Sequence, residues 1–219
     1  MAMSRVRGEK RQDGLGIAVF ARAPVAGEAK TRLIPLLGAE RAAGLHASLV
    51  CKTLASAVAA KLGDVTLWCA PDTSHSFFEK CRVEFKVRLA TQRPGDIGER
   101  MLGTFQAARG PLLLAGSDCP PLSASHFRQC ADALRGGLDA VFLPAEDGGY
   151  ALIGLQRPIA SLFLGIEWGT ERVMEETRAR LRAAALKWSE PAILWDVDRP
   201  KDVARLLEHD SQEWKAFLR

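Results

Sequence analysis

Three cationic side chains, Arg22, Lys30 and Arg32, lie within eleven positions of one another. They surround Gly27 and follow an apolar run, residues 17–21, that is long enough for a buried strand and short for a helix. A first strand followed by a cationic, glycine-containing turn is where an α/β sheet usually receives an anionic ligand. Backbone N–H groups and guanidinium groups can converge there on phosphate oxygens. We therefore predict a phosphate-binding loop, with a solvated basic turn as the alternative.

The spacing excludes two well-known phosphate loops. A Walker loop needs adjacent Gly, Lys and Ser or Thr, whereas Glu28 and Ala29 separate Gly27 from Lys30. A Rossmann loop needs three closely spaced glycines, and this turn has one. If the loop binds phosphate, it does so in another way.

A carboxylate follows a strongly apolar run, residues 112–116, which we expect to be the central strand. Asp118 comes two residues after that run and is followed by Pro120 and Pro121, which fix the turn. An Asp at the carboxyl end of a buried strand projects into the ligand crevice of the sheet, where it can bind a hard cation. The alternative is that Asp118 caps a helix that begins near Ser123.

Two further carboxylates, Asp196 and Asp198, lie at the end of an expected last strand, residues 192–197. Side chains two positions apart in a strand point to the same face. Two such carboxylates repel each other unless a cation lies between them. Together with Asp118 they would form an oxygen-rich Mg²⁺ or Mn²⁺ site. Capping of a following helix by Asp198 and Asp202 is the alternative.

Other loops offer candidates for substrate contact. Asp147 and Tyr150 flank the paired glycines Gly148 and Gly149, which make either a substrate-facing loop or a plain hairpin turn. Trp168 is a candidate binding aromatic, although a core position is common for Trp. A loop at residues 92–101, which contains Gly98, has the glycines that allow backbone to approach a ligand closely.

These candidates must be positioned by alternating strands and helices. The apolar periodicity predicts strands at residues 17–21, 65–70, 83–90, 112–116, 139–144 and 192–197, with an antiparallel insertion at 147–154. It predicts helices at residues 38–61, 74–81, 101–109, 123–135 and 170–185, and an amphipathic helix pair at residues 202–219. This order indicates one three-layer α/β/α domain, residues 15–219, with a doubly wound, mixed, mostly parallel sheet. Residues 1–14 are polar and charged, and we expect a disordered leader there.

Composition limits the class of protein. The chain has 219 residues, 47% of them hydrophobic and 26% charged, which is ordinary for a globular protein. Its net charge of +4 comes from interspersed residues, so we expect no nucleic-acid partner. Five cysteines without C-x-x-C spacing favour a reducing, cytoplasmic location. No apolar run approaches the roughly 18 residues of a membrane span, and the first residues lack the apolar core of a signal peptide.

The motifs together resemble the DUF2064 family of glycosyltransferase-A-like proteins, also described as rSAM/selenodomain-associated transferases. Five segments carry the resemblance, in the family's order along nearly the whole chain: residues 20–24 through 30–33, 116–120, 147–150, 168–170 and 196–202. More distantly, the chain is similar to molybdenum-cofactor nucleotidyltransferases and to the guanylyltransferases of coenzyme F420 synthesis. Two positions depart from the family pattern: Arg22 stands where Lys is commoner, and Arg199 stands where Thr is usual.

The resemblance implies a nucleotide-diphospho-sugar transferase fold. It implies phosphate contacts from Lys30 and Arg32, which with Asp118 would be the catalytic residues. It also implies that Asp118, Asp196 and Asp198 hold one or two Mg²⁺ or Mn²⁺ ions. The nucleotide-binding residues would be Ala21, Arg22, Gly27, Lys30, Arg32, Gly98 and Asp118. The substrate-binding residues would be Asp147, Gly148, Gly149, Tyr150 and Trp168.

We therefore expect a Mg²⁺-dependent transferase that acts on a nucleoside triphosphate or a nucleotide sugar together with a small-molecule acceptor. Nucleotidyl transfer with release of pyrophosphate and glycosyl transfer both fit, because each places charge on phosphate oxygens. The cationic loop favours nucleotidyl transfer and the family resemblance favours glycosyl transfer. A non-catalytic nucleotide-binding or regulatory module is the alternative, and an interaction protein whose loops are only turns is a third hypothesis. Exposed Trp or Leu side chains on the C-terminal helices would suit a homodimer.

Overall fold

The computed structural model describes residues 14–209 and residue 214, which form a seven-stranded sheet of order β3-β2-β1-β4-β6-β5-β7. The strands are β1 (Gly16–Arg22), β2 (Val65–Ala70), β3 (Arg88–Thr91), β4 (Leu112–Ala115), β5 (Ala140–Pro144), β6 (Tyr150–Leu155) and β7 (Trp188–Ser189). All neighbours pair in parallel except β6, which is antiparallel to β4 and β5. The predicted mixed, mostly parallel sheet and its antiparallel insertion are confirmed. The expected leader, residues 1–14, lies outside the described residues except for Gly14.

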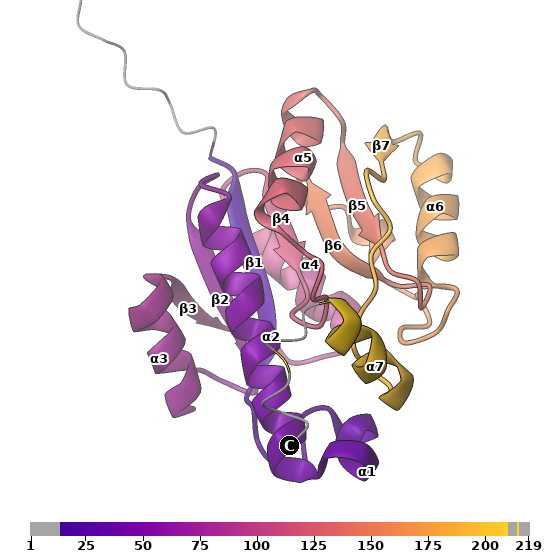
Figure 1. Ribbon diagram of the computed structural model, residues 1–219. Coiled ribbons are helices and arrows are strands. Elements are labelled where there is room, and N and C mark those ends of the chain that lie inside the picture. The colour runs from indigo at the N-terminus through magenta and orange to yellow at the C-terminus, as the bar shows by residue number, and fades with distance from the viewer. Residues whose placement is uncertain (1–13, 210–213, 215–219) are drawn as a thin grey trace, which may run out of the picture.

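Helices cover both faces of the sheet (Figure 1). They are α1 (Ile34–Leu37), α2 (Ala39–Ala59), α3 (Ser76–Phe85), α4 (Ile97–Ala107), α5 (Ala124–Arg135), α6 (Val173–Ala183) and α7 (Pro200–His209), with 3₁₀ turns η1 (Thr31–Leu33) and η2 (Ala160–Leu162). Helices α2, α3 and α5 pack on one face, whereas α4 and α6 pack on the other. The expected three layers are therefore present.

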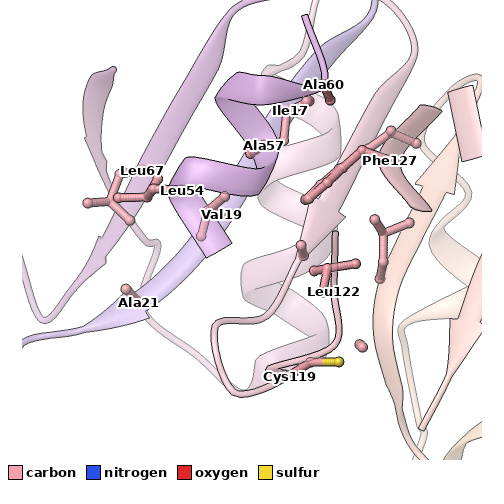
Figure 2. Packing of buried hydrophobic residues seen from close by; sticks show 14 of the residues in the cluster. Ile17, Val19, Ala21, Leu54, Ala57, Ala60, Leu67, Cys119, Leu122 and Phe127 are labelled. Carbon is pink, nitrogen blue, oxygen red and sulfur yellow. The ribbon is translucent and has the colours of Figure 1, made fainter. Parts of the chain in front are cut away.

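Strand β1 divides its side chains between the two cores. Ile17, Val19 and Ala21 point to one face, where Leu54 and Ala57 of α2 pack against them (Figure 2). The intervening residues of β1 face α4, as the period of two along a strand requires. Burial on both faces explains why this strand reads as one continuous apolar run.

A third hydrophobic cluster lies beside the sheet rather than on it. Leu33 of η1 and Leu45 of α2 pack with Trp195, Val197 and, from α7, Leu206. The cluster joins the loop after β1 to the segment that contains Asp196 and Asp198. Hydrophobic burial thus brings together two parts of the chain that carry candidate site residues.

The expected strand at residues 83–90 is wrong in its first half. Helix α3 continues to Phe85 and ends at Lys86, whose φ of 55° is left-handed, so β3 is restricted to Arg88–Thr91. Phe78 and Cys81 are buried and Phe85 packs against the same core, which is a helical spacing. Val83 has 64% of its surface exposed, so the alternation of Val83 with Phe85 does not reflect a strand.

The expected last strand, residues 192–197, is also wrong. Strand β7 ends at Ser189, and beyond it only Leu194 forms a bridge, with Ala145. Pro191 has no N–H to donate to a ladder, and the chain then crosses the end of the sheet. Asp196 and Asp198 are not in a strand, so no period of two places their side chains on one face.

Two helices begin elsewhere than expected. The loop at residues 92–101 is shorter than expected, because α4 begins at Ile97 with Asp96 as its cap in a reciprocal capping box with Glu99. Helix α6 begins at Val173 rather than at Thr170. Thr170 donates its hydroxyl to the carbonyl of Glu167 instead of capping the helix.

Helix α2 is the one described helix that is long and apolar enough to cross a membrane by length and composition. Half of its apolar window is buried inside the molecule, and a core helix passes the same test. The feature is therefore weak evidence for a membrane span.

Candidate active site

Two hollows meet at the carboxyl ends of β1 and β4. The first, of about 320 Å³, is lined by Arg22, Glu28, Ala29, Lys30, Thr31, Arg32, His46, Asp118 and Asp198. The second, of about 410 Å³, lies over β4 and β6; its polar lining includes Asp118, Asp147, Tyr150, Trp168 and Asp196. We call them the charged hollow and the apolar pocket. Asp118 lines both, so the structure brings most of the predicted residues to one edge of the sheet.

Lys30 is an anchor between three segments. It has a left-handed φ of 51°, and only 4% of its side chain is exposed. Its Nζ lies 2.9 Å from Oδ1 of Asp118 and donates to the carbonyl of Val197 at 2.6 Å. An ammonium group has three N–H donors, so one remains for a phosphate.

Asp118 is held as a carboxylate. Its burial would raise its pKa, but the nearby Lys30 ammonium and hydrogen bonding with His46 outweigh burial and keep the pKa well below the usual range. His46 Nδ1 lies 3.7 Å from Asp118 Oδ1, and Nε2 lies 3.0 Å from the carbonyl of Arg22. Asp118 still exposes 46% of its side chain, which leaves it accessible to a ligand.

The remaining cations of the charged hollow are more exposed. Arg32 pairs with Asp198, and 64% of its side chain is exposed. Arg22 is exposed and approaches only the carbonyl of Glu28, at 3.4 Å. Burial, and then repulsion by Arg22, lower the pKa of Arg100. An anion near Arg22 and Arg100 would relieve this repulsion.

Gln92 fixes the strand ends next to these cations. It is buried and donates to the carbonyls of Ala21 and Trp68, at 3.3 and 2.8 Å, and it accepts from Arg100 at 3.1 Å. The side chain of Ala21 faces the α2 core, so only its backbone belongs to the site. Gln92 and His46 were missed by the sequence analysis, because a single polar residue at a strand end or on an apolar helix gives no motif.

The acidic residues group differently from the sequence prediction. Asp118, Asp147 and Asp196 line the apolar pocket, whereas Asp198 lies in the charged hollow beside Arg32. Burial and then the charge of Asp147 raise the pKa of Asp196 to about 6. Within the described part of the chain, no three His, Cys, Asp or Glu side chains form a group that could hold a metal as they stand.

The donor chemistry nevertheless fits a hard cation. Burial, and then repulsion by Asp147, raise the pKa of Asp196, and a divalent ion next to Asp196 would offset both effects. Magnesium needs only one or two carboxylates and keeps several waters. Asp118 and Asp196 could supply them, with Asp147 close by, so Asp198 is not required for this set.

Aromatic side chains form one wall of the apolar pocket. Tyr150 and Trp168 lie edge to face, with ring centroids 6.4 Å apart. Burial raises the pKa of Tyr150 far above its usual value, and its hydroxyl contacts Met101 Sδ at 3.9 Å. Trp168 is therefore neither a pure core residue nor fully exposed, since it is half-buried at the pocket wall.

The candidate glycines have distinct roles. A Cβ at Gly98 would lie 2.4 Å from Trp168 Nε1, so Gly98 lets the indole pack against α4. Gly148 has a φ of 91°, and a Cβ there would lie 2.0 Å from the carbonyl oxygen of Glu171. Gly149 lines the pocket and donates its N–H to Asp147 Oδ1 at 2.9 Å. Gly27 forms a left-handed turn, φ 87°, but is not among the residues that line the hollows.

A family model described as "Uncharacterized protein conserved in bacteria (DUF2064)" matches residues 53–170. Among curated proteins, none matches the chain in sequence. A crystal structure from Desulfovibrio desulfuricans G20, of a protein assigned to the nucleotide-diphospho-sugar transferases, is 29% identical, with a TM-score of 0.82 and 94% of each chain covered.

Two more distant structures share the fold. One is CMP:2-keto-3-deoxy-manno-octonic acid synthetase complexed with CTP, 12% identical with a TM-score of 0.58, over 91% of this chain and 99% of the other. The other is glucosyl-3-phosphoglycerate synthase from Mycobacterium tuberculosis with Mn²⁺, uridine diphosphate and glucosyl-3-phosphoglycerate, 11% identical with a TM-score of 0.52, over 93% and 78%. The fold is therefore that of the nucleotide-diphospho-sugar transferases.

Proposed function

The chain belongs to the DUF2064 family, whose model matches more than half of it, and on that premise we propose that it is a transferase that uses a nucleotide sugar. The observation that carries the proposal is the junction of the charged hollow and the apolar pocket at Asp118. The charged hollow suits the phosphates of a donor, and the apolar pocket suits an acceptor. The D. desulfuricans relative, similar over nearly its whole length, supports the same class.

The charge of the hollow favours a nucleotide sugar over a nucleoside triphosphate. Its ionised side chains are three cations, Arg22, Lys30 and Arg32, and three carboxylates, Glu28, Asp118 and Asp198. Lys30 and Arg32 are already paired with Asp118 and Asp198. The positive charges of the loop, which favoured a triphosphate in the sequence, are thus largely neutralised by carboxylates in the fold. A diphosphate, with less charge to balance, suits the hollow better.

In this reaction an acceptor hydroxyl oxygen forms a bond to the anomeric carbon while the bond from that carbon to the phosphate oxygen breaks. The nucleoside diphosphate leaves with the bonding pair, and Arg22 and the third N–H of Lys30 stabilise its negative charge. Asp147, exposed at the pocket wall, accepts the proton of the acceptor. A divalent ion, held by Asp118 and Asp196, would supply further positive charge for the leaving diphosphate.

Thermal shift with nucleotide sugars and nucleoside triphosphates, with and without Mg²⁺ or Mn²⁺, tests the proposal. A ligand at 100 times its Kd stabilises the fold by about 2.7 kcal/mol, which is readily measured. Metal-dependent stabilisation by a nucleotide sugar, with release of nucleoside diphosphate, is the expected result. Stabilisation by a triphosphate with release of pyrophosphate would make the chain a nucleotidyltransferase. Binding without turnover would indicate a regulatory module.

The Asp196→Asn variant tests whether Asp196 binds the divalent ion. It should bind the nucleotide more weakly only when the divalent ion is present. Asp132→Asn, an exposed position on α5, is the matched control for loss of one carboxylate. If nucleotide binding by Asp196→Asn depended on the divalent ion as it does in the wild type, Asp196 would not be a metal ligand.

A further inference from the structure

The apolar pocket has walls unlike those of a site for a sugar phosphate. Apolar and aromatic side chains of one hydrophobic cluster line it: Phe20, Ile97, Met101, Tyr150 and Trp168. Its volume of about 410 Å³ falls within the range of about 300–1,000 Å³ that is typical of small-molecule sites. Such walls favour a ligand with an apolar body, because apolar surface gains free energy when it leaves water.

The charges of the pocket have one sign. Among the described residues, its lining includes Asp118, Asp147 and Asp196 but no Lys or Arg. Lys30 is the cation nearest to Asp118, and its ammonium is bound to Asp118 and to the carbonyl of Val197. Lys30 therefore balances Asp118, and Asp147 and Asp196 have no cationic partner among the described residues that line the pocket.

We propose that the acceptor is a neutral or cationic molecule with an apolar body and a hydroxyl or amine nucleophile, rather than a phosphate or a carboxylate. The proposal rests on the proposed function, because it names the second substrate of the same site. Asp147 determines this specificity: its carboxylate attracts a cationic group and repels an anionic one. The aromatic residues hold the apolar body, with the nucleophile toward Asp147, which accepts its proton.

The nucleotide base is the competing occupant, since it is also flat and neutral. The pocket, however, is lined by residues of β4 and β6, which include Leu114 and Ile153. Arg22 lies at the end of β1, where β1 pairs with Ala70 of β2 and its register with β4 has already ended at Val19. A donor whose phosphates contact Arg22 can place its base over the β1–β2 side and leave the apolar pocket to the acceptor.

Three probes with one body test the charge preference: tyrosol, tyramine and 4-hydroxyphenylacetate. Their dissociation constants are measured by calorimetry on the full chain, with and without Mg²⁺ and the nucleotide that stabilises the fold. Tyrosol and tyramine should bind at least about tenfold more tightly than 4-hydroxyphenylacetate, as expected for one uncompensated carboxylate near the ligand. Asp147→Asn should reduce the advantage of tyramine over 4-hydroxyphenylacetate. Glu171→Gln, an exposed carboxylate outside the pocket lining, should leave it unchanged.

Three results would overturn the inference. The first is equal or tighter binding of 4-hydroxyphenylacetate, and the second is absence of binding by all three probes at millimolar concentration. The third is displacement of the probes by the nucleotide, which would assign the pocket to the base. Failure of the proposed function is a separate result: no nucleotide would then stabilise the fold, while the order of the three probes would still report the ligand class of the pocket.

Discussion

Removing the carboxylate of Asp118 should destabilise the fold as well as stop catalysis. In Asp118→Asn, the Lys30 ammonium, only 4% exposed, loses its counter-charge and keeps only neutral acceptors, the carbonyl of Val197 and the new amide oxygen. Removing one partner of a buried ion pair costs about 3–5 kcal/mol. Asp118 is itself 46% exposed, so solvent screening places the expected loss at about 3 kcal/mol or less.

Urea unfolding of four proteins measures this effect: the wild type, Asp118→Asn, Lys30→Met and the double variant. The double variant should lose less than the sum of the single variants, by about 1 kcal/mol or more, since neither charge is then left unpaired. Asp198→Asn is the control, because its partner Arg32 is 64% exposed and an exposed pair is worth about 0–1 kcal/mol. A loss in Asp118→Asn no larger than that in Asp198→Asn would refute the reasoning. Inactivity of Asp118→Asn therefore has to be interpreted together with its stability.

Other predictions concern packing, pH and binding. Gly98→Ala should lower the free energy of unfolding in urea by about 1–3 kcal/mol, because the new Cβ would overlap the indole of Trp168. The control Gly116→Ala should lose less, because no atom lies closer than 4.0 Å to the position of its Cβ. Equal losses would contradict this account. The pKa of Asp196 is raised by folding from its usual value of about 4 to about 6, so the native state binds more protons between these values and stability falls as pH rises through that window. Asp196→Asn should therefore be more stable than the wild type above pH 6, by about 1–2 kcal/mol after allowance for screening. This gain in stability should vanish below about pH 4. A gain that does not depend on pH would exclude the carboxylate of Asp196 as its cause. Arg22→Gln should weaken nucleotide binding about tenfold at low salt and less at high salt, with little change in the melting temperature, and calorimetry at two salt concentrations checks it.

The sequence predicted the parts of the fold that depend on local pattern. Apolar runs bounded by Gly and Pro located β1, β2 and β4, since buried strands have a continuous apolar pattern. The alternation of apolar and polar residues at Val83, Glu84 and Phe85 was misleading, because these residues form the end of α3 and Val83 is exposed. Over three residues, such a helix end cannot be distinguished by pattern from a short strand. The family resemblance is confirmed by the match to residues 53–170.

The site could be predicted in its residue types but not in its pairings. That Lys30 and Asp118 approach a common edge follows from the order of the strands. Their ion pair could not be predicted, nor could the pairing of Arg32 with Asp198, which separates Asp198 from the other carboxylates. Each pair joins side chains that are more than 80 residues apart in the sequence. The role of His46 depends on which face of α2 turns toward Arg22, and that face is set by tertiary packing.

The hydrogen bond from Lys30 to Val197 spans 167 residues of sequence, and the hydrophobic cluster around Trp195 ties the same two segments together. During synthesis on the ribosome, β1 and β4 are both available long before Val197 and α7 emerge. A nascent chain can therefore pair its central strands while Lys30 still lacks one of its two partners. The charged hollow is therefore complete only after residues 197–198 have been translated, about 80 residues later than Asp118.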